Sequence, residues 1–244
     1  MLAFVTNRMS CTSCDKKGGC GTRKAGEKEL IGAALASLFP SRRWDAIDEE
    51  AAFLAGVSEE TGRHLARQME STLRAPARFV RGDDLERCDW IYVLCVGREP
   101  GIVELREQDS LYVADAVDGV AIEERYLRVA LSRVAPVAAV QEVVLELQRE
   151  GDVYMIEERP RNGIYDPILL GRTQKLVELL VEHDVAYLDF GLVVRPPAAF
   201  APETLWSDDG YAERYGEQPG VVNYLFYPQP ATARSLVVVP ARAA

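Results

Sequence analysis

The sequence predicts an α+β protein with a helical N-terminal part, residues 1–75, followed by a mixed β-sheet with packed helices, residues 76–244. Two observations predict this class. Apolar residues recur at helical spacing up to about residue 75, and shorter continuous or alternating apolar runs follow. At 244 residues the chain is also short enough to form one continuous domain.

The N-terminal part is predicted to contain one short strand, a glycine-rich loop and three helices. Pro40 stops the first helix, Gly56 stops the second, and Ser58 caps the third. The third helix is expected to bury Leu65 and Met69. The predicted elements are a strand at 2–5 and helices at 30–39, at 45–56 and from Ser58 through Leu73.

The remainder is predicted to alternate strands with helices. The run 89–96 is apolar on both faces, which is typical of a central, buried strand. Pro136 divides a segment of helical period into two helices, the second burying Val137, Val140, Val144 and Leu147. The predicted strands are 77–81, 89–96, 102–106, 152–157, 185–194, 221–227 and 236–239, the helices are 119–134, 136–147 and 166–184, and 195–219 is a surface excursion.

The charge of the chain is unevenly distributed. The net charge is -10, yet residues 1–43 carry eight Lys or Arg against three Asp or Glu, so the rest carries -15. A protein that works by coating nucleic acid needs a basic face, so we expect no nucleic-acid partner. The chain has no apolar run of about 18 residues and no signal peptide, which predicts a cytoplasmic protein without a membrane segment.

Three cysteines within ten residues form the most distinctive chemical feature. Cys11 and Cys14 form a C-x2-C pair, and Cys20 follows after a glycine-rich loop. In a reducing compartment such a cluster indicates metal or redox chemistry before disulfides. We therefore predict that Cys11, Cys14 and Cys20 are metal ligands.

A tetrahedral zinc site or a four-iron cluster normally takes a fourth ligand. The candidates are Cys88, Cys95, His64, Asp15 or an outside molecule. Strand alternation puts Cys88 on the face of Trp90, Tyr92 and Leu94, and Cys95 on the opposite face. Cys88 is favoured because it should lie at the accessible end of the strand, whereas Cys95 should be a small core residue.

The basic loop favours an iron-sulfur cluster over zinc. A ligated 4Fe-4S cluster is anionic and is tuned by hydrogen bonds to its sulfurs, and four basic side chains with several glycines surround the cysteines. Only one C-x2-C pair is present, whereas structural zinc sites commonly use two. Zinc, and reduced thiols without metal, remain the alternatives.

Other motifs are weaker. Residues 17–22 (KGGCGT) resemble the deviant phosphate-binding loop of the ParA/MinD family of ATPases, but the lysine expected before Thr22 is missing, so nucleotide hydrolysis is not expected. His64 is expected to be a partly buried packing residue, and His183 to meet the dipole at a helix end. The charged stretch 157–163 is expected to be a solvated loop, and Trp206, Tyr211 and Tyr215 to anchor an interface or tack the excursion to the core.

The function predicted from these features is that of a metal-binding regulator, sensor or accessory protein that acts through protein contacts. The sequence offers a cluster site but no nucleophile triad or dinucleotide fingerprint, so an enzyme is the less favoured hypothesis. One alternative is an iron-sulfur redox enzyme, with Asp189, Tyr154 or Glu157 at strand ends near its substrate. The other is a zinc-stabilised adaptor.

Overall fold

The computed structural model describes the greater part of the second region and the end of the first. The described residues are 56–82, 87–98, 100–106, 119–151, 153–161, 166–190 and, for the backbone, 235–240, with residues 32, 35, 164, 220, 221, 225 and 226. Predictions for 2–5, 45–55 and 195–219 lie outside them. Gly32 and Leu35 are helical, as expected for the helix at 30–39.

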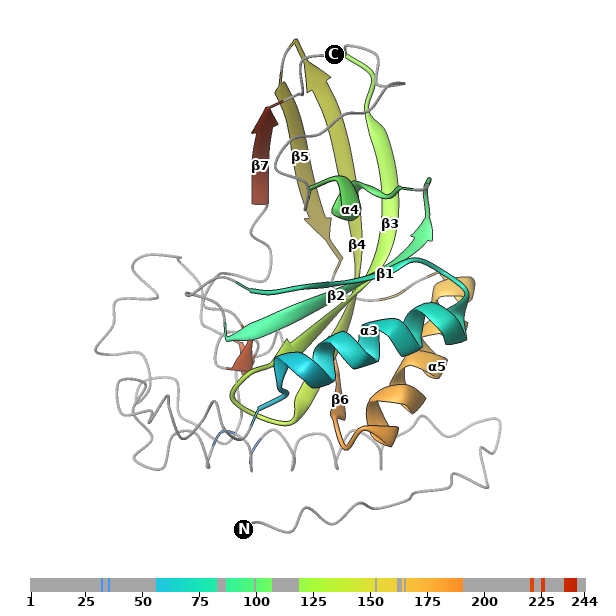
Figure 1. The fold of residues 1–244 in the computed structure, drawn as a ribbon, viewed down its shortest axis with the longest axis vertical. Coiled ribbons are helices and arrows are strands. Elements are labelled where there is room, and N and C mark those ends of the chain that lie inside the picture. Colours follow the sequence, from blue (N-terminus) through green and yellow to red (C-terminus); the bar gives the residue numbers. More distant parts are fainter. Residues whose placement is uncertain are drawn as a thin grey trace, which may run out of the picture.

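The described elements are helices and a mixed sheet, which confirms the α+β class in outline (Figure 1). No described helix is long and apolar enough to cross a membrane. The division after residue 75 stays a prediction. The elements are α3 (Glu59–Leu73), β1 (Ala77–Val80), β2 (Cys88–Val96), α4 (Ile102–Arg106), β3 (Ile122–Ser132), β4 (Val137–Glu150), β5 (Val153–Pro160), α5 (Pro167–Glu182), β6 (Ala186–Asp189) and β7 (Ser235–Pro240).

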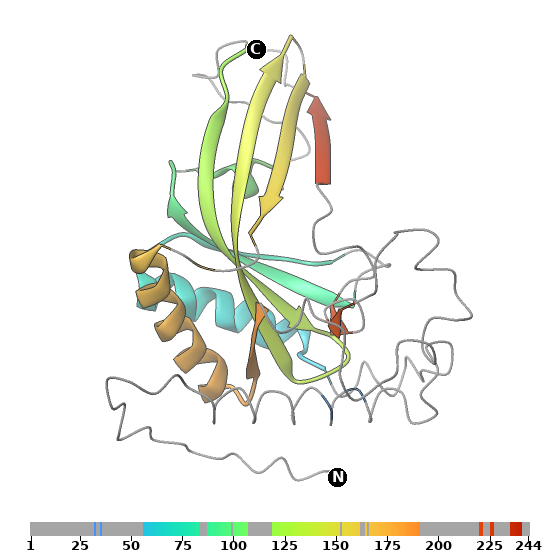
Figure 2. The same ribbon diagram turned by 180° about the vertical axis from the view of Figure 1, so that it is seen from behind.

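The sheet has seven strands in the order β1-β2-β3-β4-β5-β7, with β6 joined to β4 beside this path. Neighbours along the path are antiparallel, whereas β6 is parallel to β4. One edge of β4 pairs with β3. The other edge pairs with β6 over Val137–Val140 and with β5 over Val143–Glu150. The sheet therefore forks along β4, as the divergence of β5 and β6 shows in Figure 2.

Each face of the sheet carries its own apolar cluster. On one face, Ile91, Leu127 and Val140 pack with the apolar sides of α3 and α5, and both helices lie against the same end of the sheet in Figures 1 and 2. On the other face, Tyr92 and Val143 belong to a cluster that includes α4 residues, Leu35 and residues 221, 225 and 226. The central strands are covered on both sides, which explains their continuous apolar sequence.

The sequence predicts both long helices correctly because each carries a strong start signal. The Ser58 hydroxyl accepts the Thr61 N–H at 3.2 Å, and the Asp166 carboxylate accepts the Ile168 N–H at 2.7 Å. These N-caps satisfy donors that the first helical turn leaves unpaired. The apolar residues expected inside, Leu65, Met69, Leu73, Leu169, Leu176 and Leu180, are buried.

The predictions for 119–134 and 136–147 are wrong, because these segments form the long strands β3 and β4. Val137, Val140, Val144 and Leu147 are buried as predicted, but so are the residues between them, such as Val143 and Leu145. An apolar run buried on both faces matches a helical period as well as an alternating one. Both segments are strands because β3 pairs with β2, and β4 pairs with β5 and β6.

Three shorter predictions also need correction. Residues 102–106 form the helix α4, because the Glu124 carboxylate of β3 accepts the Ile102 N–H at 2.5 Å and fixes its first turn. Val221 and Leu225 are helical rather than extended. Residues 157–160 belong to β5 rather than to a solvated loop. The strand predicted over 185–194 is confirmed for 186–189, and those at 77–81, 89–96, 152–157 and 236–239 are confirmed with small shifts.

Two helical glycines provide a matched test of the packing of α3. A Cβ at Gly62 would lie 2.5 Å from the Phe79 ring of β1, whereas a Cβ at Gly171 of α5 would meet nothing within 4 Å. We expect Gly62→Ala to lower the free energy of unfolding by about 1–3 kcal/mol through overpacking. Gly171→Ala should raise it by about 0.5–1 kcal/mol through helix propensity. Urea denaturation measures both, and a stabilised Gly62→Ala variant would contradict the close packing.

Candidate functional site

The cysteine loop lies outside the described residues. The assignment of Cys11, Cys14 and Cys20 as ligands therefore stays a prediction. Among the residues that the structure does describe, no three His, Cys, Asp or Glu side chains gather in a way that could hold a metal ion. The structure therefore bears on the predicted site through Cys88, Cys95 and His64.

The structure separates Cys88 from Cys95 as strand alternation predicts. Cys88 belongs to the cluster of Trp90, Tyr92 and Leu94 on one face of β2. Cys95 packs against the opposite cluster, which contains α3 and α5. Because the sheet lies between the two side chains, they cannot bind one ion together.

The expected accessibility of the two cysteines is reversed. Cys88 is 0% exposed, because β2 is covered by the cluster that includes Phe226 and Leu35. Cys95 is only partly buried, since it lies at an irregularity between Leu94 and Val96 near the end of the β2–β3 pairing. Burial raises the pKa of the Cys95 thiol, so Cys95 is a poor nucleophile despite its exposure.

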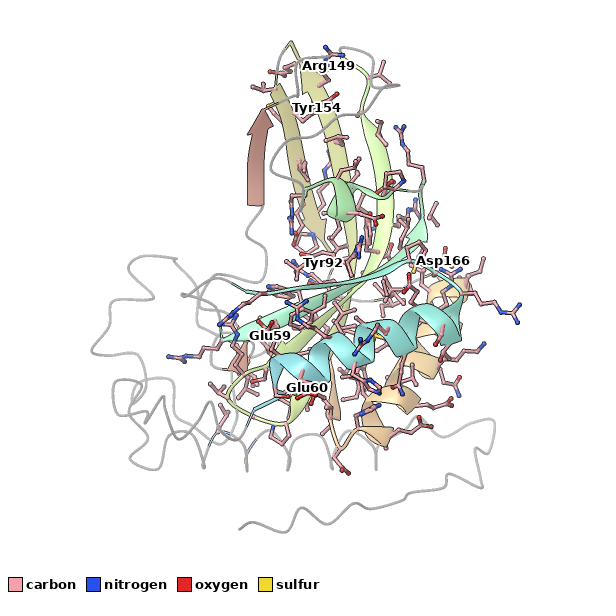
Figure 3. The ribbon with its side chains drawn as sticks, in the orientation of Figure 1. Glu59, Glu60, Tyr92, Arg149, Tyr154 and Asp166 are labelled. Atoms are coloured by element: carbon pink, nitrogen blue, oxygen red, sulfur yellow. The ribbon has the colours of Figure 1, made fainter. Side chains whose placement is uncertain are left out.

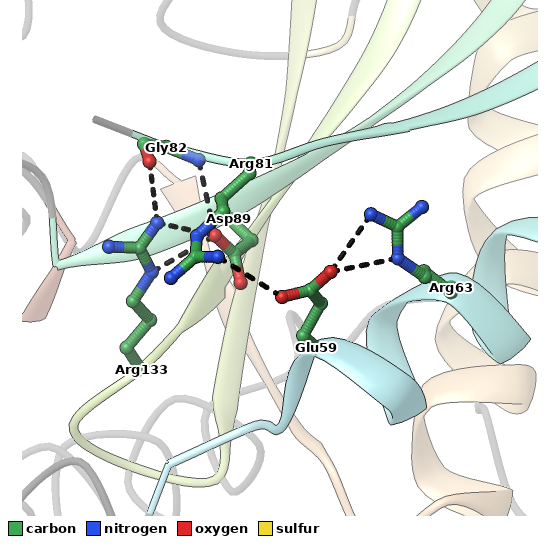
Figure 4. A network of polar contacts seen from close by, with 6 residues as sticks. All are labelled: Glu59, Arg63, Arg81, Gly82, Asp89 and Arg133. Carbon is green, nitrogen blue, oxygen red and sulfur yellow. Dashed lines mark hydrogen bonds and ion pairs between the residues drawn. The ribbon is translucent and has the colours of Figure 1, made fainter. Parts of the chain in front are cut away.

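The carboxylate beside Cys88 is committed to a polar network (Figure 4). Arg133 donates to Asp89 Oδ1 from Nε at 2.9 Å and from Nη2 at 2.6 Å, and the Gly82 N–H donates to the same oxygen at 3.1 Å. Arg133 Nη2 also donates to the Gly82 carbonyl at 2.7 Å. The network joins the end of β1, the start of β2 and the turn after β3. Asp89 therefore has a structural role, because its Oδ1 is held by Arg133 and Gly82.

The remaining sequence candidates do not form one site. His64 is exposed on α3, so the expectation that it is partly buried is wrong. Tyr154 and Glu157 lie on opposite faces of β5, because their positions differ by an odd number. Asp189 ends β6, on the other branch of the sheet. These three strand-end residues are therefore spread over the sheet rather than gathered round a substrate.

A buried polar group on the sheet, which the sequence did not predict, is the most developed arrangement among the described residues. We call it the buried arginine centre, and it consists of Trp90, Tyr92, Arg128, Gln141 and Glu158. Strand register brings it together, since Arg128 lies opposite both Tyr92 and Gln141. Figure 3 shows Tyr92 near the middle of the sheet and Tyr154 near the far end. The centre lies on the same face as Cys88.

The contacts of the centre hold the Arg128 guanidinium on several sides. Nη1 forms an ion pair with Glu158, Nη2 donates to Gln141 Oε1 at 2.6 Å, and the guanidinium carbon lies 4.4 Å from the centroid of the Trp90 ring. The Tyr92 hydroxyl donates to the second Glu158 oxygen at 3.3 Å. Arg128 and Glu158 are less than a tenth exposed, so the charges are balanced inside the protein.

The polarity of the centre determines what it can bind. Both Glu158 oxygens accept hydrogen bonds, whereas Arg128 Nε and Gln141 Nε2 are buried without a hydrogen-bond partner in the described part of the chain. The unpaired atoms are donors, which interact with acceptor oxygens and not with cations. The centre is therefore not suited to hold a metal, and its contacts link β2, β3, β4 and β5.

A second buried glutamate caps α4. Glu124 accepts the Tyr126 hydroxyl and the Ile102 N–H, both at 2.5 Å, and the Arg98 N–H at 3.2 Å. Burial and the Glu124 carboxylate raise the pKa of Tyr126 well above its ordinary value of 10.0. Tyr126 is consequently held in its protonated form as a donor.

A third buried glutamate lies at the fork of the sheet. Glu142 follows the β6 pairing and precedes the β5 pairing on β4, and its side chain is 1% exposed. Neither of its oxygens has a hydrogen-bond partner among the described residues, and its ion pair to Arg161 Nη1 spans 3.4 Å. The Arg161 backbone N–H donates to the Glu142 carbonyl at 2.9 Å, which ties the end of β5 to the fork.

Comparisons with known proteins do not identify the chain. No family model, no curated protein and no solved structure matches it. Its function is therefore inferred from its own residues.

We predict that the buried arginine centre contributes strongly to stability. Glu158→Ala should lower the free energy of unfolding by about 3–5 kcal/mol, because it leaves the Arg128 charge buried without its partner. The double variant Arg128→Met, Glu158→Ala should recover part of this loss. Glu59→Ala, which breaks exposed pairs with Arg63 and Arg81, is the matched control and should change stability little. Equal losses of stability in Glu158→Ala and Glu59→Ala would contradict the strong contribution of the buried arginine centre.

The raised pKa of Tyr126 predicts a loss of stability at alkaline pH. The folded state retains the phenol proton above pH 10, where the unfolded chain releases it, so stability is fully present below about pH 10 and falls as pH rises. Tyr126→Phe has no such proton, and its free energy of unfolding should fall less steeply between about pH 10 and pH 11. Parallel slopes in the two proteins would refute the burial of a protonated Tyr126.

Proposed function

We propose that this chain is a metal-binding regulator, sensor or accessory protein that carries a 4Fe-4S cluster and acts through protein contacts. Cys11, Cys14 and Cys20 are the proposed ligands. The observation that carries the proposal is their spacing, C-x2-C-x5-C, inside a glycine-rich loop in the basic end of an acidic chain. A cytoplasmic location follows from the reducing conditions that such thiols need.

The surroundings of Cys88 support its proposed role as the fourth ligand. Leu35, which follows Cys20 by fifteen residues, is buried in the same apolar cluster as Cys88. About ten of these residues precede the helix at 30–39, and they reach up to roughly 35 Å when extended, at about 3.3–3.6 Å per residue. The cysteine loop is therefore long enough to cover this end of β2. A cluster there would be shielded from solvent, because Cys88 itself is buried.

The described residues favour a regulator over the alternative of a redox enzyme. The buried arginine centre is internally neutralised, and Asp189, Tyr154 and Glu157 lie apart. The zinc-stabilised adaptor stays as the second alternative, since three thiolates also suit zinc.

Metal analysis of anaerobically purified protein tests the proposal. We expect broad absorption near about 400 nm and about four irons with matching acid-labile sulfide per chain, both absent from Cys14→Ser. Colourless protein with about one zinc per chain would contradict the cluster and support the zinc-stabilised adaptor. Full metal content in Cys14→Ser would overturn the site altogether.

A second series of variants tests the fourth ligand. Cys88→Ala keeps an apolar side chain in the buried cluster, so the domain should still fold, but its iron content should fall. Cys95→Ser is the matched control on the opposite face of β2 and should keep full iron content. If Cys88→Ala also keeps all its iron, the fourth ligand lies elsewhere.

A further inference from the structure

The two histidines of the chain meet at the contact between α3 and α5. The sequence contains only His64 and His183, which lie on different helices and far apart in sequence. Their ring centroids are 5.2 Å apart, with an angle of 68° between the ring planes. An edge-to-face ring contact explains such packing alone, but three further features of the pair go beyond it.

The first feature is the fixed position of both residues. α3 and α5 bury Leu65, Met69, Leu176 and Leu180 in one cluster, which holds the helices against the same face of the sheet. His183 is the C-cap of α5, and its backbone N–H donates to the Leu180 carbonyl at 3.1 Å. The two imidazoles are therefore presented by rigid elements rather than by loops, as a preformed site requires.

The second feature is a hydrogen bond that orients one ring. Gln68 lies one helical turn after His64, and its Oε1 is 2.6 Å from His183 Nε2. An amide oxygen can only accept, so Nε2 is the donor in this contact, and in the neutral ring Nδ1 then carries the lone pair. Histidines that bind metal commonly donate their second ring N–H to an oxygen in this way.

The third feature is the separation of the rings. Two imidazoles that share one tetrahedral ion at metal–nitrogen distances of about 2.0–2.1 Å have centroids about 5 Å apart. The observed 5.2 Å agrees with this spacing. His64 is exposed and His183 is half-buried, so an ion can reach the pair from solvent.

We propose that His64 and His183 form a two-histidine site for a divalent transition-metal ion, with Zn²⁺ as the ion tested. Imidazole is a preferred ligand of such ions. No third His, Cys, Asp or Glu joins the pair among the described residues, so solvent supplies the remaining ligands. The site uses none of the proposed ligands Cys11, Cys14, Cys20 and Cys88. It would bridge α3 and α5, and an ion that binds only the folded protein raises its stability.

Nuclear magnetic resonance of the histidine rings tests this proposal directly. With only two histidines in the chain, full-length protein labelled with ¹⁵N-histidine gives two sets of ring signals, whatever the cysteines bind. Addition of Zn²⁺ should move both sets together, with the His183 signals showing Nε2 protonated and Nδ1 as the ligand. Signals that stay unchanged, or a shift of one ring only, would overturn the shared site.

Substitutions provide the second arm of the experiment. His64→Asn and His183→Asn should each weaken Zn²⁺ binding by the remaining ring at least tenfold, because each leaves a single imidazole. Gln68→Leu keeps both rings but removes the orienting acceptor, and should weaken binding less. Arg67→Asn, an exposed neighbour on α3, is the matched control and should bind as the parent does. Undiminished binding by the ring that remains in either histidine variant would also refute the proposal.

Discussion

The pairing of β4 is the constraint on which the rest of the structure depends. β4 joins β3 along one edge, and β6 and β5 in succession along the other. Its side chains from Val137 to Leu145 are buried on both faces. A strand covered in this way belongs to both apolar clusters. It therefore holds α3 and α5 on one face of the sheet and α4 on the other.

Three buried glutamates accompany this strand arrangement, and each lies where elements must be aligned. Glu158 holds Arg128 across the sheet, Glu124 caps α4, and Glu142 lies at the fork between β5 and β6. A buried charge costs free energy unless it is paired or hydrogen-bonded, and an alternative register would separate Glu158 from Arg128 and Glu124 from the Ile102 N–H. The polar residues inside the sheet therefore specify one arrangement of strands rather than merely adding stability.

How far the sequence predicted the fold and the site depended on how local each signal was. Ser58 and Asp166 start their helices with side chains that reach only two or three residues along the chain, so these helices were predicted correctly. The sequence predicts helices for β3 and β4, because an apolar run that is buried on both faces matches a helical period as well as an alternating one. For the same reason the sequence does not predict the buried arginine centre, since Arg128 and Gln141 lie opposite each other only if both segments are strands. Alternation on β2 separated Cys88 from Cys95 correctly, but it could not show which end of the strand is covered.

By itself the sequence determined the α+β class, the caps of the long helices, the opposed faces of Cys88 and Cys95, and the clustering of three cysteines in a basic loop. These depend on spacing, charge and short-range hydrogen bonds, which one chain segment contains in full. The tertiary structure alone decided that two apolar segments are strands, that Cys88 is buried in the same apolar cluster as Leu35, and that the two histidines meet between α3 and α5. Each of these results depends on contacts between distant segments, whose free energy no local pattern contains.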